Sequence, residues 1–221
     1  VYSHQALKTA LENWMRGIAG TNHRVFYAMK ANSNLALLKF FHDSGTGFDI
    51  VSRGELQRAL MAGAKGNDIV YSGVGKSRED IRAALRADIG CFNVESIPEL
   101  DRINEVALEE KRMAPVSVRV NPDVDAKTHP YISTGLKNNK FGVSYDQTVA
   151  LYQHAATLPG IRISGIDMHI GSQITELEPF VHAADKIFDI VDALAQNGIM
   201  LDHLDFGGGL GVRYTDETPP S

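Results

Sequence analysis

The chain has 221 residues, enough to bury one large core, so a single domain is expected. Its formal net charge of -5 argues against nucleic acid or an anionic membrane surface as a partner, and no apolar run approaches the roughly 18 residues of a membrane span. The one cysteine, Cys91, cannot form an internal disulfide, which favours a reducing, cytoplasmic compartment. The simplest interpretation of Cys91 is a small, buried strand residue.

An amphipathic helix over residues 5–16 is predicted to open the chain. After it, short β-rich runs alternate with amphipathic stretches, a pattern typical of βα units around a parallel sheet. The predicted strands cover residues 25–31, 48–52, 69–72, 91–94, 116–120, 165–170 and 203–206. The predicted helices lie near residues 34–43, 55–62, 78–87, 97–108, 145–158 and 177–197.

Neighbouring side chains on a strand point to opposite faces, and this alternation separates apolar from polar residues here. In residues 116–121, three valines share one face and Arg119 lies on the other. Asp167 and His169 likewise alternate with apolar neighbours. This pattern predicts an α/β fold of the (β/α)8 TIM-barrel type, with its site at the C-terminal rim of the strands. A doubly wound open sheet is the rival, but its strands should be apolar on both faces.

The number of strands and the two chain ends predict a fragment. Seven strands are one short of a closed barrel, the chain begins with Val1 rather than Met, and it stops in a loop-like Pro-Pro-Ser. We expect residues 1–221 to form one barrel domain, incomplete at both ends and truncated before the eighth strand. Such a fragment is expected to lack turnover by itself.

Lys30 is the candidate nucleophile of the site. It shares strand parity with Phe26 and Ala28, which directs it toward the mouth of the barrel. Partial burial there would lower its pKa from about 10.4 and free a neutral amine to attack an aldehyde. The alternative is a solvated lysine at a strand end.

His169 and Ser172 follow the predicted strand 165–170. The flat imidazole of His169 can stack on an aromatic cofactor ring, and Ser172 offers a hydroxyl and a backbone N–H to a phosphate. The alternatives are a hydrogen-bonded core histidine and an ordinary loop serine.

Gly207, Gly208 and Gly209 follow the strand 203–206. Consecutive glycines let backbone N–H groups approach an anion, and the loops after the seventh and eighth strands of a barrel commonly bind phosphate. A simple turn is the alternative. A dinucleotide site is less favoured, because its glycine motif should open a βαβ unit and no second half follows.

Three charged residues complete the candidate set. Asp49 could orient Lys30 or balance its charge. Glu55 could belong to the same polar group, or it could simply favour the start of a helix. Arg119 faces inward, where it needs an anionic partner. A metal site has little support, because no close histidine pair has a carboxylate at ligand spacing. An amine, a stacking ring and a phosphate cradle on one rim meet the requirements of pyridoxal phosphate.

The chain resembles the pyridoxal-phosphate-dependent decarboxylases of the alanine-racemase-like fold group, and within them most closely the diaminopimelate decarboxylases. The resemblance rests on these segments, which span nearly the whole chain in order: 27–34, 48–56, 93–100, 118–125, 128–142, 165–173 and 204–211. The run from Arg119 to Asp125, continued by His129, Gly135 and residues 140–142, favours diaminopimelate over ornithine or arginine.

The resemblance implies a role for each matching residue. Lys30 matches the lysine that carries the cofactor, and His169 the histidine that stacks on the pyridine ring. Phosphate contacts match Ser172, Gly207, Gly208 and Gly209, while Asp49, Glu55 and Arg119 match a polar shell around the lysine and ring.

The resemblance further implies decarboxylation of meso-2,6-diaminopimelate to L-lysine by a cytoplasmic homodimer. It also places further cofactor and substrate residues beyond position 221. The alternatives are a decarboxylase of arginine, ornithine or carboxynorspermidine, a non-catalytic pyridoxal-phosphate-binding barrel, and a phosphosugar barrel enzyme.

Overall fold

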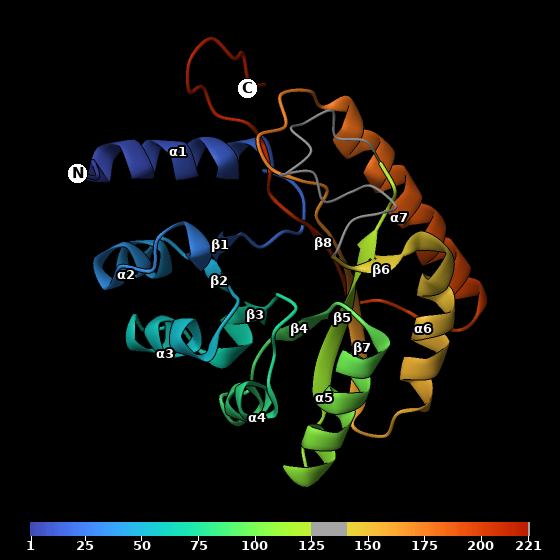
Figure 1. The fold of residues 1–221 in the computed structure, drawn as a ribbon. Helices are drawn as coiled ribbons and strands as arrows, with labels where there is room; N and C mark the ends of the chain where they lie inside the picture. The colour runs from blue at the N-terminus through green and yellow to red at the C-terminus, as the bar shows by residue number, and fades with distance from the viewer. Residues whose placement is uncertain (125–140, 221) are drawn as a thin grey trace.

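The structure is a computed structural model that describes residues 1–124 and 141–220. A curved sheet of parallel strands forms its centre, with helices packed around the outside (Figure 1). The sheet order is β1-β2-β3-β4-β5-β7-β8, and the short β6 pairs with β5. The strands are β1 (Phe26–Ala28), β2 (Gly47–Ile50), β3 (Ile69–Tyr71), β4 (Cys91–Val94), β5 (Ala114–Asn121), β6 (Val143–Ser144), β7 (Ile161–Met168) and β8 (His203–Phe206).

At the start of four helices that follow strands, a polar side chain caps the first turn. Asn34, Ser52, Ser77 and Ser96 accept backbone N–H groups at the first turns of α2, α3, α4 and α5. The helices are α1 (His4–Gly17), α2 (Leu35–Asp43), α3 (Arg53–Met61), α4 (Arg78–Arg86), α5 (Ile97–Glu109), α6 (Tyr145–Thr157) and α7 (Glu178–Gln196). Two 3-10 turns cover Met29–Ala31 and Gly66–Asp68.

The hydrophobic core lies between the sheet and the helices that cover it. Fully buried side chains come from strands (Phe48, Ile69, Phe92, Val116, Ile166) and from helices (Leu38, Ile81, Leu100, Ile103, Leu151). The alternating pattern therefore confirms the α/β class and the parallel barrel-type sheet. Among the described strands, β1 pairs only with β2 and β8 only with β7, so the sheet stays open between β1 and β8.

Three strand predictions need correction. The first strand ends at Ala28 rather than at residue 31, because asparagines turn the chain there: Asn32 Oδ1 accepts Asn34 N–H, and Asn34 Oδ1 accepts Ala36 N–H. The predicted strand 165–170 instead covers Ile161–Met168, so His169 follows it, and β7 pairs with β5 from Ala114 to Val120. The two-residue β6 was not predicted at all, because a run so short has no periodicity to detect.

A β-bulge interrupts the β5–β7 pair. Pairing runs from Val116↔Ile163 directly to Ser117↔Gly165, so Ser164 is an extra residue on β7. The Ser164 hydroxyl donates to Val116 O at 3.1 Å, which satisfies one of the carbonyls that the bulge disturbs.

Tyr152 from α6 fills the remaining hydrogen-bonding positions at the bulge. Its ring is fully buried, its hydroxyl donates to Gly165 O at 2.5 Å, and the same oxygen accepts Val118 N–H at 3.3 Å. The side chain thus replaces a strand-to-strand contact that the extra residue removes.

We expect Tyr152→Phe to lower the free energy of unfolding by about 1–3 kcal/mol, because it leaves a buried N–H and a buried C=O without this partner. Urea unfolding followed by circular dichroism measures the change. Tyr214→Phe, at a ring that is 77% exposed, is the control and should leave the unfolding free energy unchanged. Equal stability of both variants would show that the bulge does not depend on the Tyr152 hydroxyl.

Candidate functional site

Polar side chains gather at one level of the inner face of the sheet. The register aligns Arg119 of β5 with Asp167 of β7, and Asp167 with Asp205 of β8. Asp49 occupies the equivalent region of β2, opposite Ala28. These residues come from segments far apart in the chain, and the parallel register alone brings them to the same rim.

Arg119 is held mainly by a carboxylate that follows β4. Its Nη1 donates to Glu95 Oε1 at 2.9 Å, while Nε lies 3.9 Å from Asp167 Oδ2. The guanidinium also lies over the ring of Phe141, 5.3 Å from its centroid. The prediction that an inward arginine has an anionic partner is therefore confirmed.

The carboxylates around Arg119 are buried close to one another. Burial raises the pKa of Asp49 to about 6; a 2.6 Å hydrogen bond from Ser72 Oγ opposes that rise, and the Asp205 charge adds to it. Burial and the Asp205 charge raise the pKa of Asp167 well above its usual value, and burial raises that of Asp205. Both effects favour retention of protons in this cluster at neutral pH.

Lys30 lies in the 3-10 turn directly after β1, so the predicted strand parity does not apply to it. Its charge acts on the pKa values of both Asp49 and His169, so the amine belongs to the same electrostatic cluster as these two groups. Within the described part of the chain, however, the Lys30 side chain is exposed, so the prediction that it is partly buried is wrong. The amine is accessible to a ligand at the rim.

His169 follows β7 and is half-buried. Burial lowers its pKa to about 4, with further lowering by the charges of Arg119 and Lys30, although a hydrogen bond with the Gly208 backbone opposes the shift. The imidazole is therefore neutral at neutral pH, which suits a ring that stacks on another aromatic group.

The loops after β7 and β8 pair with each other, which brings Ser172 to the glycine loop. Ile174 N–H donates to Gly209 O at 2.9 Å, and Gly211 N–H donates to Ile174 O at 2.8 Å. Gln173 extends the pairing, because its side-chain amide donates to Val212 O and accepts Val212 N–H. The two loops thus form one small structure at the rim.

Only glycine fits at two positions of this loop. A Cβ on Gly207 would lie 2.7 Å from Met168 O and 2.9 Å from His169 Nδ1. Gly209 has φ +116°, and a Cβ there would lie 2.1 Å from Gly171 O. At Gly208 a Cβ would meet nothing within 4 Å, so the backbone faces open space beside His169. Such a loop can admit a small anion close to its backbone.

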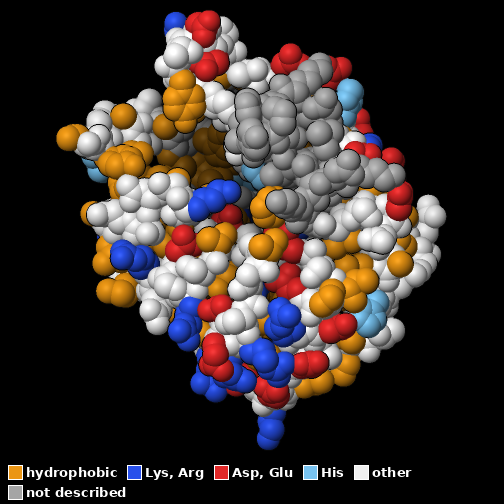
Figure 2. All heavy atoms as spheres, in the orientation of Figure 1, with side chains coloured by type: hydrophobic (Ala, Val, Ile, Leu, Met, Phe, Trp, Pro, Cys, Tyr) orange, Lys and Arg blue, Asp and Glu red, His pale blue; other side chains and the backbone are white. Residues whose placement is uncertain are grey.

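One face of the molecule is hollowed, with apolar side chains on the floor of the hollow and basic and histidine side chains nearby (Figure 2). The rim provides an accessible amine, a neutral flat ring and a glycine loop. These groups match the aldehyde, the aromatic ring and the phosphate of pyridoxal phosphate.

Comparison with known proteins agrees with this match. The family model described as "Pyridoxal-dependent decarboxylase, pyridoxal binding domain" matches residues 4–221. The chain belongs to this family. Pyridoxal phosphate is therefore its cofactor, and the resemblance to pyridoxal-phosphate-dependent decarboxylases inferred from sequence motifs is confirmed.

Named relatives lie within the same family. A diaminopimelate decarboxylase of Neisseria meningitidis serogroup B is 55% identical over 220 residues, covering 100% of this chain and 53% of the relative. The crystal structure of Helicobacter pylori diaminopimelate decarboxylase complexed with L-lysine matches with a TM-score of 0.97 and 43% identity, over 100% of this chain and 56% of that one. A lysine decarboxylase from Selenomonas ruminantium matches with a TM-score of 0.82 and 26% identity, over 93% and 51%.

The chain spans about half the length of the curated relatives it matches. In the part that the structure describes, no helix is both long and apolar enough to cross a membrane. Residues 128–140 of the segment that favours diaminopimelate, with His129 and Gly135, lie outside the described residues.

Two other residues have the simpler roles considered for them. Glu55 caps α3: its Oε2 accepts Val51 N–H at 2.7 Å, and its own N–H donates to Ser52 Oγ at 3.2 Å. Cys91 is buried on β4. Asp205 and Glu95 were not among the candidate residues predicted from the sequence. Strand alternation could have indicated both, because Asp205 shares a face of its strand with His203, and Glu95, one residue past β4, continues the face of Asn93.

The lowered pKa of His169 predicts an acid-dependent loss of stability. Between about pH 6.5 and 4 the unfolded histidine binds a proton that the folded one does not, so the protein loses stability as the pH falls through this range. We expect His169→Gln to reduce the loss between pH 7.5 and 4.5 by on the order of 2–3 kcal/mol.

Urea unfolding at the two pH values measures the difference. His182→Gln, at an exposed histidine of α7, is the matched control and should lose as much stability as the original protein. An equal acid loss in His169→Gln would mean that His169 titrates alike in the folded and unfolded states.

Proposed function

We propose that this chain is the pyridoxal-binding part of an enzyme that decarboxylates meso-2,6-diaminopimelate to L-lysine and carbon dioxide. The observation that carries the proposal is the meeting of Lys30, His169 and the glycine loop at one rim of the sheet. The substrate follows from the 55% identity to a diaminopimelate decarboxylase and from the close structural match to such an enzyme in complex with L-lysine.

The proposed cofactor contacts divide among three elements. Lys30 would hold the aldehyde end of the cofactor through Nζ, and the neutral ring of His169 would lie against its pyridine ring. Ser172 with Gly207, Gly208 and Gly209 would hold the phosphate. When bound there, pyridoxal phosphate supplies an electron sink for the electron pair left by the departing carboxylate.

Asp49 and Arg119 set the charge around the lysine. Asp49 is acted on by the Lys30 charge and has a pKa of about 6, so its carboxyl can balance or exchange a proton with Nζ near neutral pH. The charge of Arg119 opposes the rise in the pKa of Asp167 that burial and the neighbouring carboxylates cause, and it disfavours a charged His169. These residues set the charge around the proposed cofactor site.

The wider setting is part of the same proposal. Residues 1–221 form one barrel domain of the enzyme, which works as a homodimer in the cytoplasm on a small amino-acid substrate, without nucleic acid or membrane as partner. The net charge of -5, the single buried cysteine and the family relationship support this setting.

Lys30 is expected to be the attachment point of the cofactor. Incubation with pyridoxal phosphate and reduction with borohydride should leave the cofactor on the peptide that contains Lys30, as read by mass spectrometry. Lys30→Ala should abolish the label, because Lys30 is the lysine whose charge acts on both Asp49 and His169 at the proposed site. Lys39→Ala, an exposed lysine on α2, should keep it. Labelling of another lysine instead would refute the assignment.

The enzyme that contains this chain together with the remaining half found in its relatives should prefer meso-diaminopimelate to ornithine and arginine. We expect a ratio of kcat/KM of about 100 or more, since a site that binds the distal carboxylate leaves polar groups unpaired with substrates that lack it. Release of carbon dioxide with each substrate measures the ratio.

The 221-residue chain alone is the negative control and should show no turnover, because its described sheet is open between β1 and β8. Equal turnover of ornithine by the longer enzyme would move the proposal to the polyamine-forming decarboxylases.

A further inference from the structure

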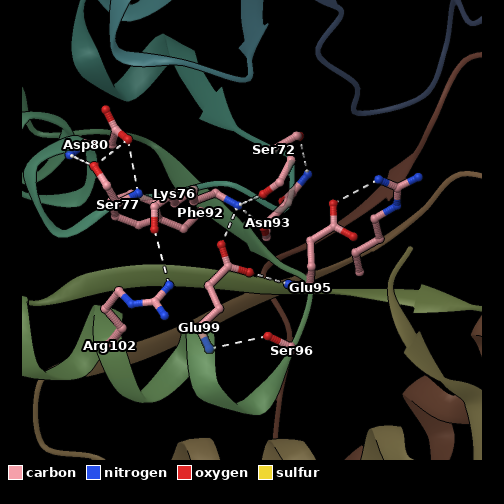
Figure 3. Close-up of polar contacts among 12 residues, drawn as sticks. Ser72, Lys76, Ser77, Asp80, Phe92, Asn93, Glu95, Ser96, Glu99 and Arg102 are labelled. Atoms are coloured by element: carbon pink, nitrogen blue, oxygen red, sulfur yellow. Dashed lines mark hydrogen bonds and ion pairs between the residues drawn. The ribbon is translucent and has the colours of Figure 1, made fainter. Parts of the chain in front are cut away.

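Glu95 lies between the arginine of the rim and a neighbouring piece of backbone. Its Oε1 accepts Arg119 Nη1 and its Oε2 accepts Gly142 N–H, both at 2.9 Å. The side chain is 4% exposed, so water cannot readily replace either bond. Figure 3 shows Glu95 at the end of β4, between the guanidinium on one side and Glu99 on the other.

A buried ion pair fixes the position of Glu95 from below. Glu95 N–H donates to Glu99 Oε2 at 2.7 Å, and Glu99 Oε1 accepts Lys76 Nζ at 2.8 Å (Figure 3). Lys76 also donates to Gly73 O at 2.6 Å and to Asn93 O at 2.8 Å, so all three of its donors have partners. The main chain at Glu95 therefore has little freedom to move.

Residues 141–143, whose Gly142 N–H donates to Glu95 Oε2, are packed against Arg119 as well. Phe141 covers the guanidinium, and Val143 pairs with Val120 of β5. Gly142 has φ +78°, and a Cβ there would lie 2.9 Å from Arg119 O. The Glu95 carboxylate thus joins the Arg119 side chain to the backbone of Gly142, which itself lies close to the Arg119 backbone.

Arg119 in turn faces the groups proposed to bind the cofactor. It lies level with Asp167 across the β5–β7 pair, and its charge acts on Asp49 and His169. A displaced guanidinium would change the electrostatic environment of both residues, and the Lys30 charge acts on the same two residues.

We propose that Glu95 is a positioning residue of the cofactor site, which holds Arg119 against the inner carboxylates and fixes it to residues 141–143. The proposal rests on the proposed function. Glu95 does not touch the cofactor itself and acts through Arg119. A buried ion pair with only a structural role would stabilise the fold without this coupling.

A double-mutant cycle separates the two roles. Glu95→Gln keeps the shape but offers one acceptor oxygen for two donors, so it should raise the Kd for pyridoxal phosphate and lower kcat, each about 10-fold. In an Arg119→Gln background the same change should have almost no further effect on either quantity. The coupling of about 10-fold corresponds to about 1.4 kcal/mol.

The measurements are an absorbance titration with pyridoxal phosphate and the rate of carbon dioxide release by the longer enzyme. Glu110→Gln is the matched control, since Glu110 also pairs with arginines, but with Arg82 and Arg86 on the outer helices. It should leave the Kd and kcat unchanged. If Glu95→Gln does not fold, Glu95→Asp keeps the charge one methylene shorter and should show a smaller loss that also vanishes without Arg119.

The outcomes distinguish this proposal from the proposed function. Effects of Glu95 and Arg119 substitutions that simply add, or a Glu95→Gln variant that behaves like Glu110→Gln, would overturn the positioning role alone. An unmodified longer enzyme that neither carries the cofactor on Lys30 nor releases carbon dioxide would overturn the proposed function.

Discussion

The inner face of the sheet buries more carboxylate than basic side chains, and the site depends on how Arg119 is held among these groups. Asp49, Asp167, Asp205 and Glu95 all lie in this region, whereas Lys30 is exposed at its edge. Buried like charges repel strongly in a poorly hydrated environment. The Arg119 guanidinium and the raised pKa values of Asp49, Asp167 and Asp205 reduce that repulsion. The position of Arg119 therefore affects the charge of these carboxylates.

The same electrostatic balance gives His169 its chemical character. The pKa of His169 falls to about 4. Burial is the largest cause, and Arg119 and Lys30 act in the same direction. The rim therefore offers a neutral imidazole beside acidic groups, and a pyridine ring can pack on it without the cost of a buried charge.

Sequence patterns predicted much of this arrangement, for a definable physical reason. Strand parity placed Arg119 and Asp167 on the inner side because alternation depends only on local backbone geometry, whereas His169 lies one residue past the end of β7. It failed at Lys30, where Asn32 and Asn34 bond to nearby backbone and end the strand early. Short polar side chains compete with sheet hydrogen bonds in this way, and periodicity does not register that competition.

The contacts of Tyr152 and Glu95 were beyond prediction for a different reason. Tyr152 is needed only because Ser164 is an extra residue in β7, and the bulge arises from the pairing of two strands. Glu95 bonds to residues 24 and 47 positions away in the chain. Such contacts depend on the assembled register, so no local pattern in the sequence encodes them.

The exposure of Lys30 follows from where the site lies in the sheet. β1 and β8 are the two edges of the described sheet; Lys30 follows the first, and the glycine loop follows the second. The groups proposed to bind the aldehyde and the phosphate thus lie on opposite sides of the open gap, while Arg119 belongs to the fully paired β5 and His169 directly follows the fully paired β7. The paired strands supply the fixed geometry and charge, and the edges supply the accessible amine and backbone that a bound ligand must reach.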